Sequence, residues 1–271
     1  MRKKKISKVE TDGFISQEAD EGKKYIVNTY KDIFKLAKEL NQFSMRFLGK
    51  QVIDYKSHYK VIIHTLLIRE IEIFQAVYLL LERGMMAASK NLTRSMLEIL
   101  FTVVALQKKP ELLQCYLDQN EKNHFKALRA ALCFKGKDLV ASLSSHNIKA
   151  ILEKKEAEIN EKALKTLSIK RWAIEAELED FYNLYYVTYS TATHSSLASL
   201  DDHVDEESSG VISLALGPSN KDFYEVFKCC LSSLINLMNS VGKVYNVNLS
   251  DDLDKFANIL NRLDNLYLTN K

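Results

Sequence analysis

Arg94 and Glu98 are the first pair of side chains in this sequence whose types and spacing could do chemistry. They lie four residues apart, so on a helix they would share one face. They are the charged residues of segment 91–107, NLTRSMLEILFTVVALQ, which is otherwise apolar or small and neutral. A helix that is apolar on nearly all sides belongs in a protein interior. A charged pair there needs polar partners, because an unpaired buried charge is costly.

A second segment supplies such partners. Residues 183–200, NLYYVTYSTATHSSLASL, contain no Asp, Glu, Lys or Arg, and His194 is the one side chain that titrates near neutrality. Ser190 and His194 lie four residues apart on one helical face, Tyr186 precedes Ser190 by four, and Tyr189 lies one step round the helix. We expect these two helices, which lack charge apart from a few residues, to pack on one another at the centre of a bundle.

The residues predicted to meet there are Arg94, Glu98, Tyr189, Ser190 and His194. Arginine supplies a rigid fork of donors, glutamate accepts, and the other three side chains can do either. One interpretation is a satisfied polar network that fixes how the core packs. The other is a catalytic pocket in which Arg94 holds an anion such as a phosphate while His194 and Glu98 transfer protons.

The rest of the chain predicts helices to position these residues. Two prolines and eight glycines in 271 residues are few breakers, which favours long helices over a β-sandwich or a doubly wound sheet. Apolar periodicity predicts helices over residues 18–48, 54–83, 85–107, 110–134, 147–167, 168–200, 221–245 and 249–268. We predict an all-α fold, a multi-helix antiparallel bundle of about seven to nine helices within one domain, 17–271. Its core is expected from helices 54–83, 85–108, 110–134 and 168–200.

Several local features refine this plan. Arg69 and Glu70 are neighbours and cannot share a helical face, so one of them should turn inward. Segment 147–167 mixes charges at close spacing, which is typical of a solvated helix and makes it the best candidate for a protruding arm. Gly84 allows a tight turn. Segment 211–217, VISLALG, could be a short strand or an extended link.

Charge is concentrated at the start of the chain. The net charge is +3, and the five basic residues within positions 1–8 exceed it, so the remainder is close to neutral. The folded body therefore lacks the basic balance of a nucleic-acid-binding protein. Residues 1–16 are predicted to be a basic disordered tail, either simply solvated or acting as a clamp on nucleic acid or on an acidic partner.

The sequence offers little sign of a cofactor or metal. The four cysteines, Cys115, Cys133, Cys229 and Cys230, have no CxxC spacing, which indicates reduced thiols that fill helix interfaces. The acidic stretch 201–210, DDHVDEESSG, is rich in potential ligands but lacks metal-binding order, so we expect a solvated loop. Phosphate-binding glycine loops and nucleophile elbows are not found. We predict no cofactor and no metal.

Neither a secretory signal peptide nor a membrane span is predicted. The basic start is followed by ISKVETDG and not by an apolar run. The uninterrupted apolar runs are far shorter than the roughly 18 residues that a spanning helix needs. A cytoplasmic protein is expected.

The two motifs resemble a known family. An R-x-x-x-E on a central helix, here Arg94 to Glu98, and a later Y-S-x-x-x-H, here Tyr189 to His194, are similar to recurrent features of a bacterial all-helical family, domain of unknown function 5677. The resemblance covers about residues 55–200. Some members of that family sit among anti-phage defence genes, so the resemblance implies a role in defence or in a toxin–antitoxin system.

A second comparison concerns the HEPN helical ribonucleases, which carry R-x4–6-H on one helix. Such enzymes need no metal, because arginine orients the scissile phosphate and histidine serves as acid or base. No arginine of this chain has a histidine at that spacing, so Arg94 and His194 would have to meet in space.

Two functions follow as expectations. The first is a non-enzymatic helical module that works through a protein partner or as a homo-oligomer. The second is a metal-independent endoribonuclease built on Arg94, Glu98 and His194, with RNA as its substrate.

Overall fold

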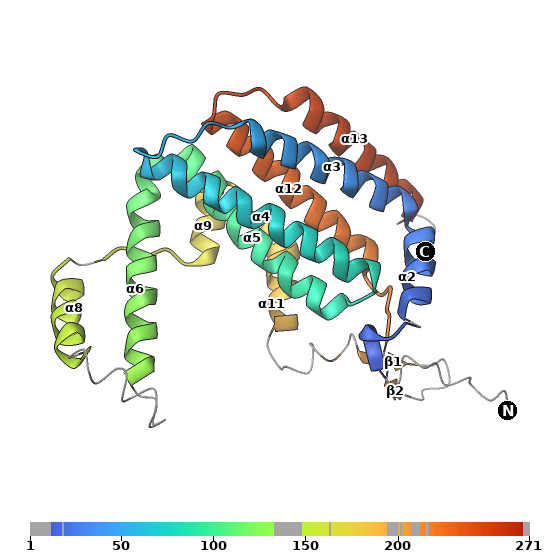
Figure 1. Ribbon diagram of the computed structural model, residues 1–271, viewed down its shortest axis with the longest axis horizontal. Coiled ribbons are helices and arrows are strands. Elements are labelled where there is room, and N and C mark those ends of the chain that lie inside the picture. Colours follow the sequence, from blue (N-terminus) through green and yellow to red (C-terminus); the bar gives the residue numbers. More distant parts are fainter. Residues whose placement is uncertain are drawn as a thin grey trace.

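Helix α5 (Met86–Lys108) lies at the centre of the protein (Figure 1). It packs against α4 (His58–Glu82), α9 (Ile169–Ala176), α11 (Val187–Thr193) and α12 (Phe223–Val244). Every residue from 99 to 106 is buried, so α5 is enclosed on all sides over two turns. The charge-poor sequence of this helix predicted that central position.

The structure is a computed structural model. It describes residues 12–17, 19–132, 148–162, 164–193, 200, 203–206, 212–214 and 217–267. The remaining described elements are η1 (Gly13–Ile15), α2 (Ala19–Thr29), α3 (Lys31–Lys50), η2 (Pro110–Leu112), α6 (Leu113–Leu132), α8 (Ile148–Lys162), α10 (Glu179–Phe181), a π-helical turn η3 (Tyr182–Tyr186), β1 (Val204–Glu206), β2 (Ile212–Leu214) and α13 (Ser250–Tyr267).

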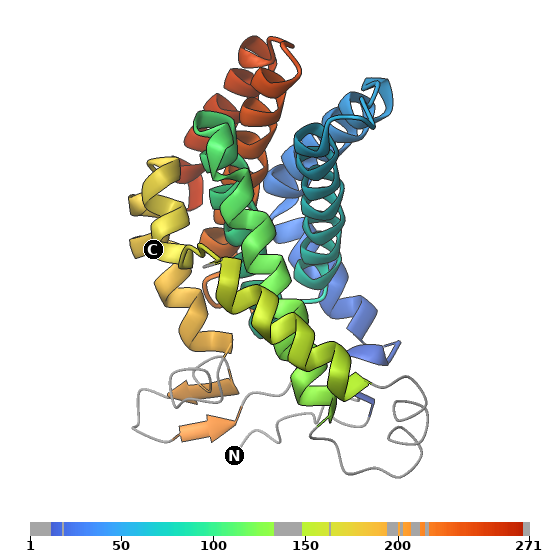
Figure 2. The same ribbon diagram turned by 90° about the vertical axis from the view of Figure 1, so that its left-hand side faces the viewer.

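The predicted all-α fold is confirmed. The long helices run side by side in layers, with α3 and α13 over α12, and α4 beside α5 (Figures 1 and 2). Their buried side chains form one continuous hydrophobic cluster. Within the described part of the chain, no helix combines the length and apolar character that a membrane crossing would need.

The set of helices that forms the core differs from the predicted set. Helix α6 was expected in the core, but it leaves the bundle and packs beside α8, and α12 takes its place (Figure 1). The physical reason is the distribution of charge. Charged side chains recur along most of α6, whereas α12 places its charges near its ends and buries most of its middle.

The predicted helix 168–200 is also wrong as a single element. Ser168 caps α9 as expected, since its hydroxyl accepts from the Arg171 amide at 3.2 Å. The helix then ends at Glu177, which adopts the left-handed conformation with φ 57°. Its N–H and that of Leu178 bond back to the carbonyls of Ile174 and Ala173, a Schellman-type end. The chain restarts as α10, η3 and α11.

The N-terminal predictions need two corrections. Residues 13–15 of the predicted disordered tail form the turn η1, and the Phe14 carbonyl accepts a hydrogen bond from Arg83 at 3.1 Å. The other part of the tail, residues 1–11, lies outside the described residues. The predicted helix 18–48 divides at Tyr30, whose ring stacks on Phe223 at 4.1 Å between centroids.

A short antiparallel ribbon joins α11 to α12. Val204 pairs with Leu214 and Glu206 with Ile212. Of the two alternatives for 211–217, a short strand or an extended link, residues 212–214 form the strand. Part of the acidic stretch predicted as a loop is its paired strand. His203 is exposed, and residues 201, 202 and 207–210 lie outside the described residues.

We predict that Gly84→Ala destabilises the fold. Gly84 has φ +69°, and an added Cβ would lie 2.8 Å from the backbone of Ser219 and 2.9 Å from Ile26. The left-handed backbone alone costs about 1–2 kcal/mol for a residue with a Cβ. Thermal unfolding should show a melting temperature lower by several degrees. Gly49→Ala is the matched control, because its Cβ meets nothing within 4 Å, and it should be neutral or slightly stabilising. Equal effects of the two substitutions would contradict this account of the turn.

Candidate functional site

The two charge-poor segments, 91–107 and 183–200, meet through polar side chains, as predicted. Helix α5 presents Arg94 and Glu98 on one face, and η3 with α11 presents Tyr186 and Ser190. Arg94 pairs with Ser190 and Glu98 with Tyr186, so the two segments cross with opposite directions. We call these four residues the Arg94 cluster.

The Tyr186 hydroxyl is the centre of the Arg94 cluster. It accepts a hydrogen bond from Arg94 Nη2 at 2.7 Å and donates one to Glu98 Oε1 at 3.0 Å. Arg94 Nη2 also forms an ion pair with Glu98 Oε1 at 2.9 Å. Arg94 Nε donates to Ser190 Oγ at 3.0 Å, and that hydroxyl donates to the Tyr186 carbonyl at 2.7 Å. Each polar group therefore has a partner of opposite character.

The cluster sits at the edge of the core and is partly open. The Tyr186 ring is buried, whereas the Arg94 and Glu98 side chains keep 24% and 33% of their surface exposed. The guanidinium carbon of Arg94 lies 4.8 Å from the Tyr186 ring centroid, within cation–π range. Burial, and secondly the charge of Glu98, raise the pKa of Tyr186 above its usual value. The tyrosine therefore stays protonated at neutral pH and serves as a donor.

A π-helical turn places Tyr186 at this position. The Val187 amide bonds to the Tyr182 carbonyl five residues back, which widens the helix by one residue. The ring of Tyr182 stacks on that of Tyr186 at 5.1 Å and 18°. Single π turns inside helices often mark functional sites, and here the turn rotates Tyr186 toward α5.

The predicted site residues have different outcomes. Arg94, Glu98 and Ser190 lie together. Tyr189 does not face them, because it is buried toward α12, where its hydroxyl is a hydrogen-bonding partner of the Cys229 thiol. His194 lies outside the described residues. Tyr186, which the predicted set did not include, takes the central position; its four-residue spacing from Ser190 was the signal in the sequence.

This arrangement limits what Arg94 can do. Its charge is neutralised by Glu98, and its Nε and Nη2 are occupied within the protein. A phosphate would have to compete with Glu98 for the guanidinium. The contacts of the Arg94 cluster form a polar connection between two helical segments, and one side of the cluster is partly exposed.

A second polar cluster is fully buried between α4 and α12. Glu70 turns inward and accepts a hydrogen bond from Ser233 Oγ at 2.8 Å, while Arg69 is exposed, as the neighbour argument required. Burial raises the pKa of Glu70 well above its usual value, so the carboxyl is neutral. Burial, followed by the charge that Glu70 would carry, also raises the pKa of the Cys229 and Cys230 thiols.

These thiols are reduced and buried, as predicted, and a raised pKa leaves little of the reactive thiolate. Among the residues that the structure describes, three or more His, Cys, Asp or Glu side chains do not gather into a group that could hold a metal ion.

We predict that Tyr186→Phe lowers the free energy of unfolding by about 1–3 kcal/mol, because Arg94 and Glu98 both lose a buried partner. Chemical denaturation measures the change. Tyr182→Phe is the matched control: it lies in the same turn, and its hydroxyl makes no hydrogen bond to the residues that the structure describes. It should change stability by less than about 0.5 kcal/mol. Similar losses in both variants would show that the hydroxyl of Tyr186 has no special role.

We predict that Glu70→Gln makes stability less dependent on pH. The folded pKa of Glu70 is raised, so its contribution is full below the unfolded pKa and is lost as pH rises toward the folded pKa. The loss is up to about 1.4 kcal/mol per pH unit. Between pH 5 and pH 8, wild type should therefore lose stability relative to Glu70→Gln in chemical denaturation. Glu72→Gln, exposed on the same helix, should follow the wild-type profile. Parallel profiles for wild type and Glu70→Gln would refute the assignment.

Comparison with known proteins identifies a family. No curated protein and no solved structure gives a significant match to this chain. A family model described as a family of unknown function, DUF5677, matches residues 59–211, which is more than half of the chain. The matched region contains all of α4 except its first residue, the whole of α5 and the whole Arg94 cluster. The chain therefore belongs to the family of unknown function DUF5677.

Proposed function

We propose that this protein is a non-enzymatic helical module that binds a protein partner in the cytoplasm of a bacterium, within an anti-phage defence or toxin–antitoxin system. The observation that carries the proposal is the arm formed by α6 and α8. Both helices stand clear of the bundle (Figure 1). A paired surface of this kind, held out from the core, suits contact with another protein.

The arm is anchored at its base. Leu113 and Tyr116 in the first turn of α6 pack against the core, and the Tyr116 ring meets Trp172 edge-on at 6.4 Å. Further along, Asp118 accepts from the Lys165 amide at 2.9 Å, and Lys122 donates to the Leu164 carbonyl at 2.9 Å. These bonds fasten the segment that returns from α8 to α9.

Beyond this base the described arm is held by polar contacts. Glu121 pairs with Lys155 at 2.8 Å and with Lys162 at 3.6 Å, and Arg129 approaches Glu156 at 3.9 Å. Exposed ion pairs of this kind contribute little stability. Past Asp118, none of the described side chains of α6 and α8 is buried. Helices gain most of their stability by packing an apolar face, and a partner would supply that packing here.

The Arg94 cluster supports a non-enzymatic role. Arg94 and Glu98 neutralise one another, and Tyr186 and Ser190 occupy further donor and acceptor positions. A side chain that must bind a phosphate or transfer a proton needs donor or acceptor positions that are not already occupied by neighbouring side chains. The setting in defence comes from the resemblance described above and is part of the proposal.

The second candidate is a metal-independent ribonuclease. The observation that favours it is the partial exposure of Arg94 and Glu98, which leaves one side of the cluster accessible to a ligand. In this proposal His194 would act as acid or base and Arg94 would orient the phosphate. RNA would then be the substrate.

We predict that the arm contacts a specific protein in the native host. A photo-crosslinking amino acid at Leu117 or Ala127, both exposed on α6, should give one discrete adduct. Mass spectrometry then identifies it as another protein or as a second copy of this chain. Ile68, exposed on α4, is the control position and should give no discrete adduct. Absence of an adduct at both arm positions, with the protein expressed at its natural level, would contradict the proposal.

RNA integrity separates the two candidate functions. Wild type and His194→Ala are expressed at equal levels, and cell growth, RNA integrity and melting temperature are measured for both. We expect intact RNA with wild type. If wild type cuts RNA and His194→Ala does not, while both melt at the same temperature, the ribonuclease replaces the binding module as the better account.

A further inference from the structure

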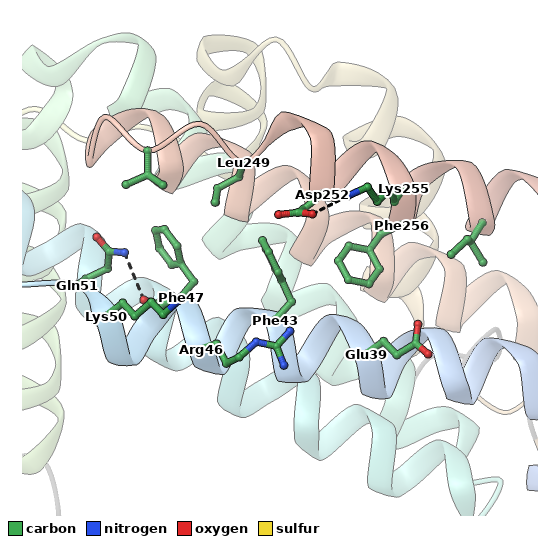
Figure 3. Close-up of a pocket in the computed structure, with 12 residues that line it drawn as sticks. Glu39, Phe43, Arg46, Phe47, Lys50, Gln51, Leu249, Asp252, Lys255 and Phe256 are labelled. Carbon is green, nitrogen blue, oxygen red and sulfur yellow. Dashed lines mark hydrogen bonds and ion pairs between the residues drawn. The ribbon is translucent and has the colours of Figure 1, made fainter.

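Helices α3 and α13 border a groove of about 580 Å³ on the side of the bundle away from α5 (Figure 3). Its floor is apolar. Phe43 and Phe47 come from α3, Leu249 from the loop before α13, and Phe256 from α13. The ring centroids of Phe43 and Phe256 lie 5.6 Å apart, and the two ring planes are inclined by 59°. The rings therefore do not stack on one another, and the groove stays open.

Two cations on the rim lack partners. Arg46 and Lys50 are exposed, lie four residues apart on one face of α3, and form no ion pair with any residue that the structure describes. The third rim cation differs, because Lys255 on α13 pairs with Asp252 at 2.9 Å. The groove therefore joins an apolar floor to two uncompensated positive charges.

The charges are ordered along the groove. Glu39, the remaining acidic residue of the rim, lies at the end of the groove opposite to Lys50, with Arg46 between them (Figure 3). Lys50 follows Glu39 by eleven positions on the helix, a rise of about 16 Å. A ligand with one negative end would be attracted to the Arg46–Lys50 end and repelled from the other, which fixes its direction.

We propose that this groove binds a small amphipathic anion, with an apolar body on the phenylalanine floor and one carboxylate or phosphate group between Arg46 and Lys50. The volume lies within the range of about 300–1,000 Å³ that small-molecule sites occupy. The floor supplies hydrophobic contact, and the cations supply orientation and selectivity for negative charge. The site involves neither the Arg94 cluster nor the α6–α8 arm, so it stands independently of the function proposed above.

Isothermal titration of the full chain with molecules of one chain length tests this site. Decanoate and decyl phosphate are the anionic probes, and their relative affinities show which head group the site prefers. Decyltrimethylammonium and decyl maltoside carry the same chain with positive and neutral heads. We expect one anionic probe to bind at least about tenfold more tightly than either. Equal affinity for the neutral or cationic probe would overturn the proposal.

Charge-reversed variants test the residues. Arg46→Glu with Lys50→Glu should weaken binding of the anion by about tenfold or more. The control reverses Lys31 and Lys35, which have the same spacing on α3, are equally exposed and do not line the groove. It should leave affinity within about twofold of wild type. Unchanged affinity in the groove variant, with a wild-type melting temperature, would overturn the assignment.

A third variant tests the apolar floor. Val247→Asn places an uncharged polar group on the groove wall at a residue that is 38% exposed, so the fold should tolerate it. All four probes should bind more weakly. If the paired charge reversal lowers the melting temperature, the single variants Arg46→Gln and Lys50→Gln replace it; anion affinity that neither of them reduces would also overturn the proposal.

Discussion

The pairing of Arg94 with Glu98 around the Tyr186 hydroxyl is the interaction on which the centre of this protein depends. Helix α5 is enclosed by apolar neighbours, and a charge at its surface is tolerated only where opposite charge and donors meet it. Tyr186 satisfies both partners with one hydroxyl, and Ser190 completes the set. The π-helical turn gives the tyrosine its position, so a local irregularity of η3 and the burial of α5 depend on each other.

Glu70 is a second charged residue type that the interior accommodates through a polar partner. An acidic side chain faces the interior of α4, and the protein accommodates it by keeping it neutral and giving it the Ser233 hydroxyl. Both polar clusters lie where helices cross, and both restrict how those helices can pack. Buried polar pairs of this kind favour one arrangement over alternatives of similar apolar contact.

The sequence was sufficient for the features that depend on composition along one helix. The burial of the charge-poor helix α5, the inward turn of one of the neighbours Arg69 and Glu70, the Ser168 cap and the turn at Gly84 were all predictable. The sequence was insufficient where two helices compete for one place in the core. Helices α6 and α12 are both amphipathic, and the choice between them for the core depends on where the charges fall along each helix. Glu177, which ends α9 in the left-handed conformation, is neither a glycine nor next to a glycine or proline, so the sequence has no signal for this helix end.

The candidate site was predictable in part for a similar reason. A four-residue spacing identified Arg94, Glu98 and Ser190 as members of one network. Tyr186 precedes Ser190 by four residues and shares its face, whereas Tyr189, which the predicted set named, lies one step round the helix and faces Cys229. The π turn at Tyr182–Tyr186 is an irregularity that regular helical spacing does not predict.

The most direct measurement is a double-mutant cycle between Arg94 and Tyr186, using Arg94→Met, Tyr186→Phe and the double variant in chemical denaturation. If the hydroxyl and the guanidinium form the polar connection described above, the two losses should be strongly non-additive, with a coupling free energy of about 1 kcal/mol or more. Additive losses, with coupling near zero, would show that the two side chains act separately and would contradict the account.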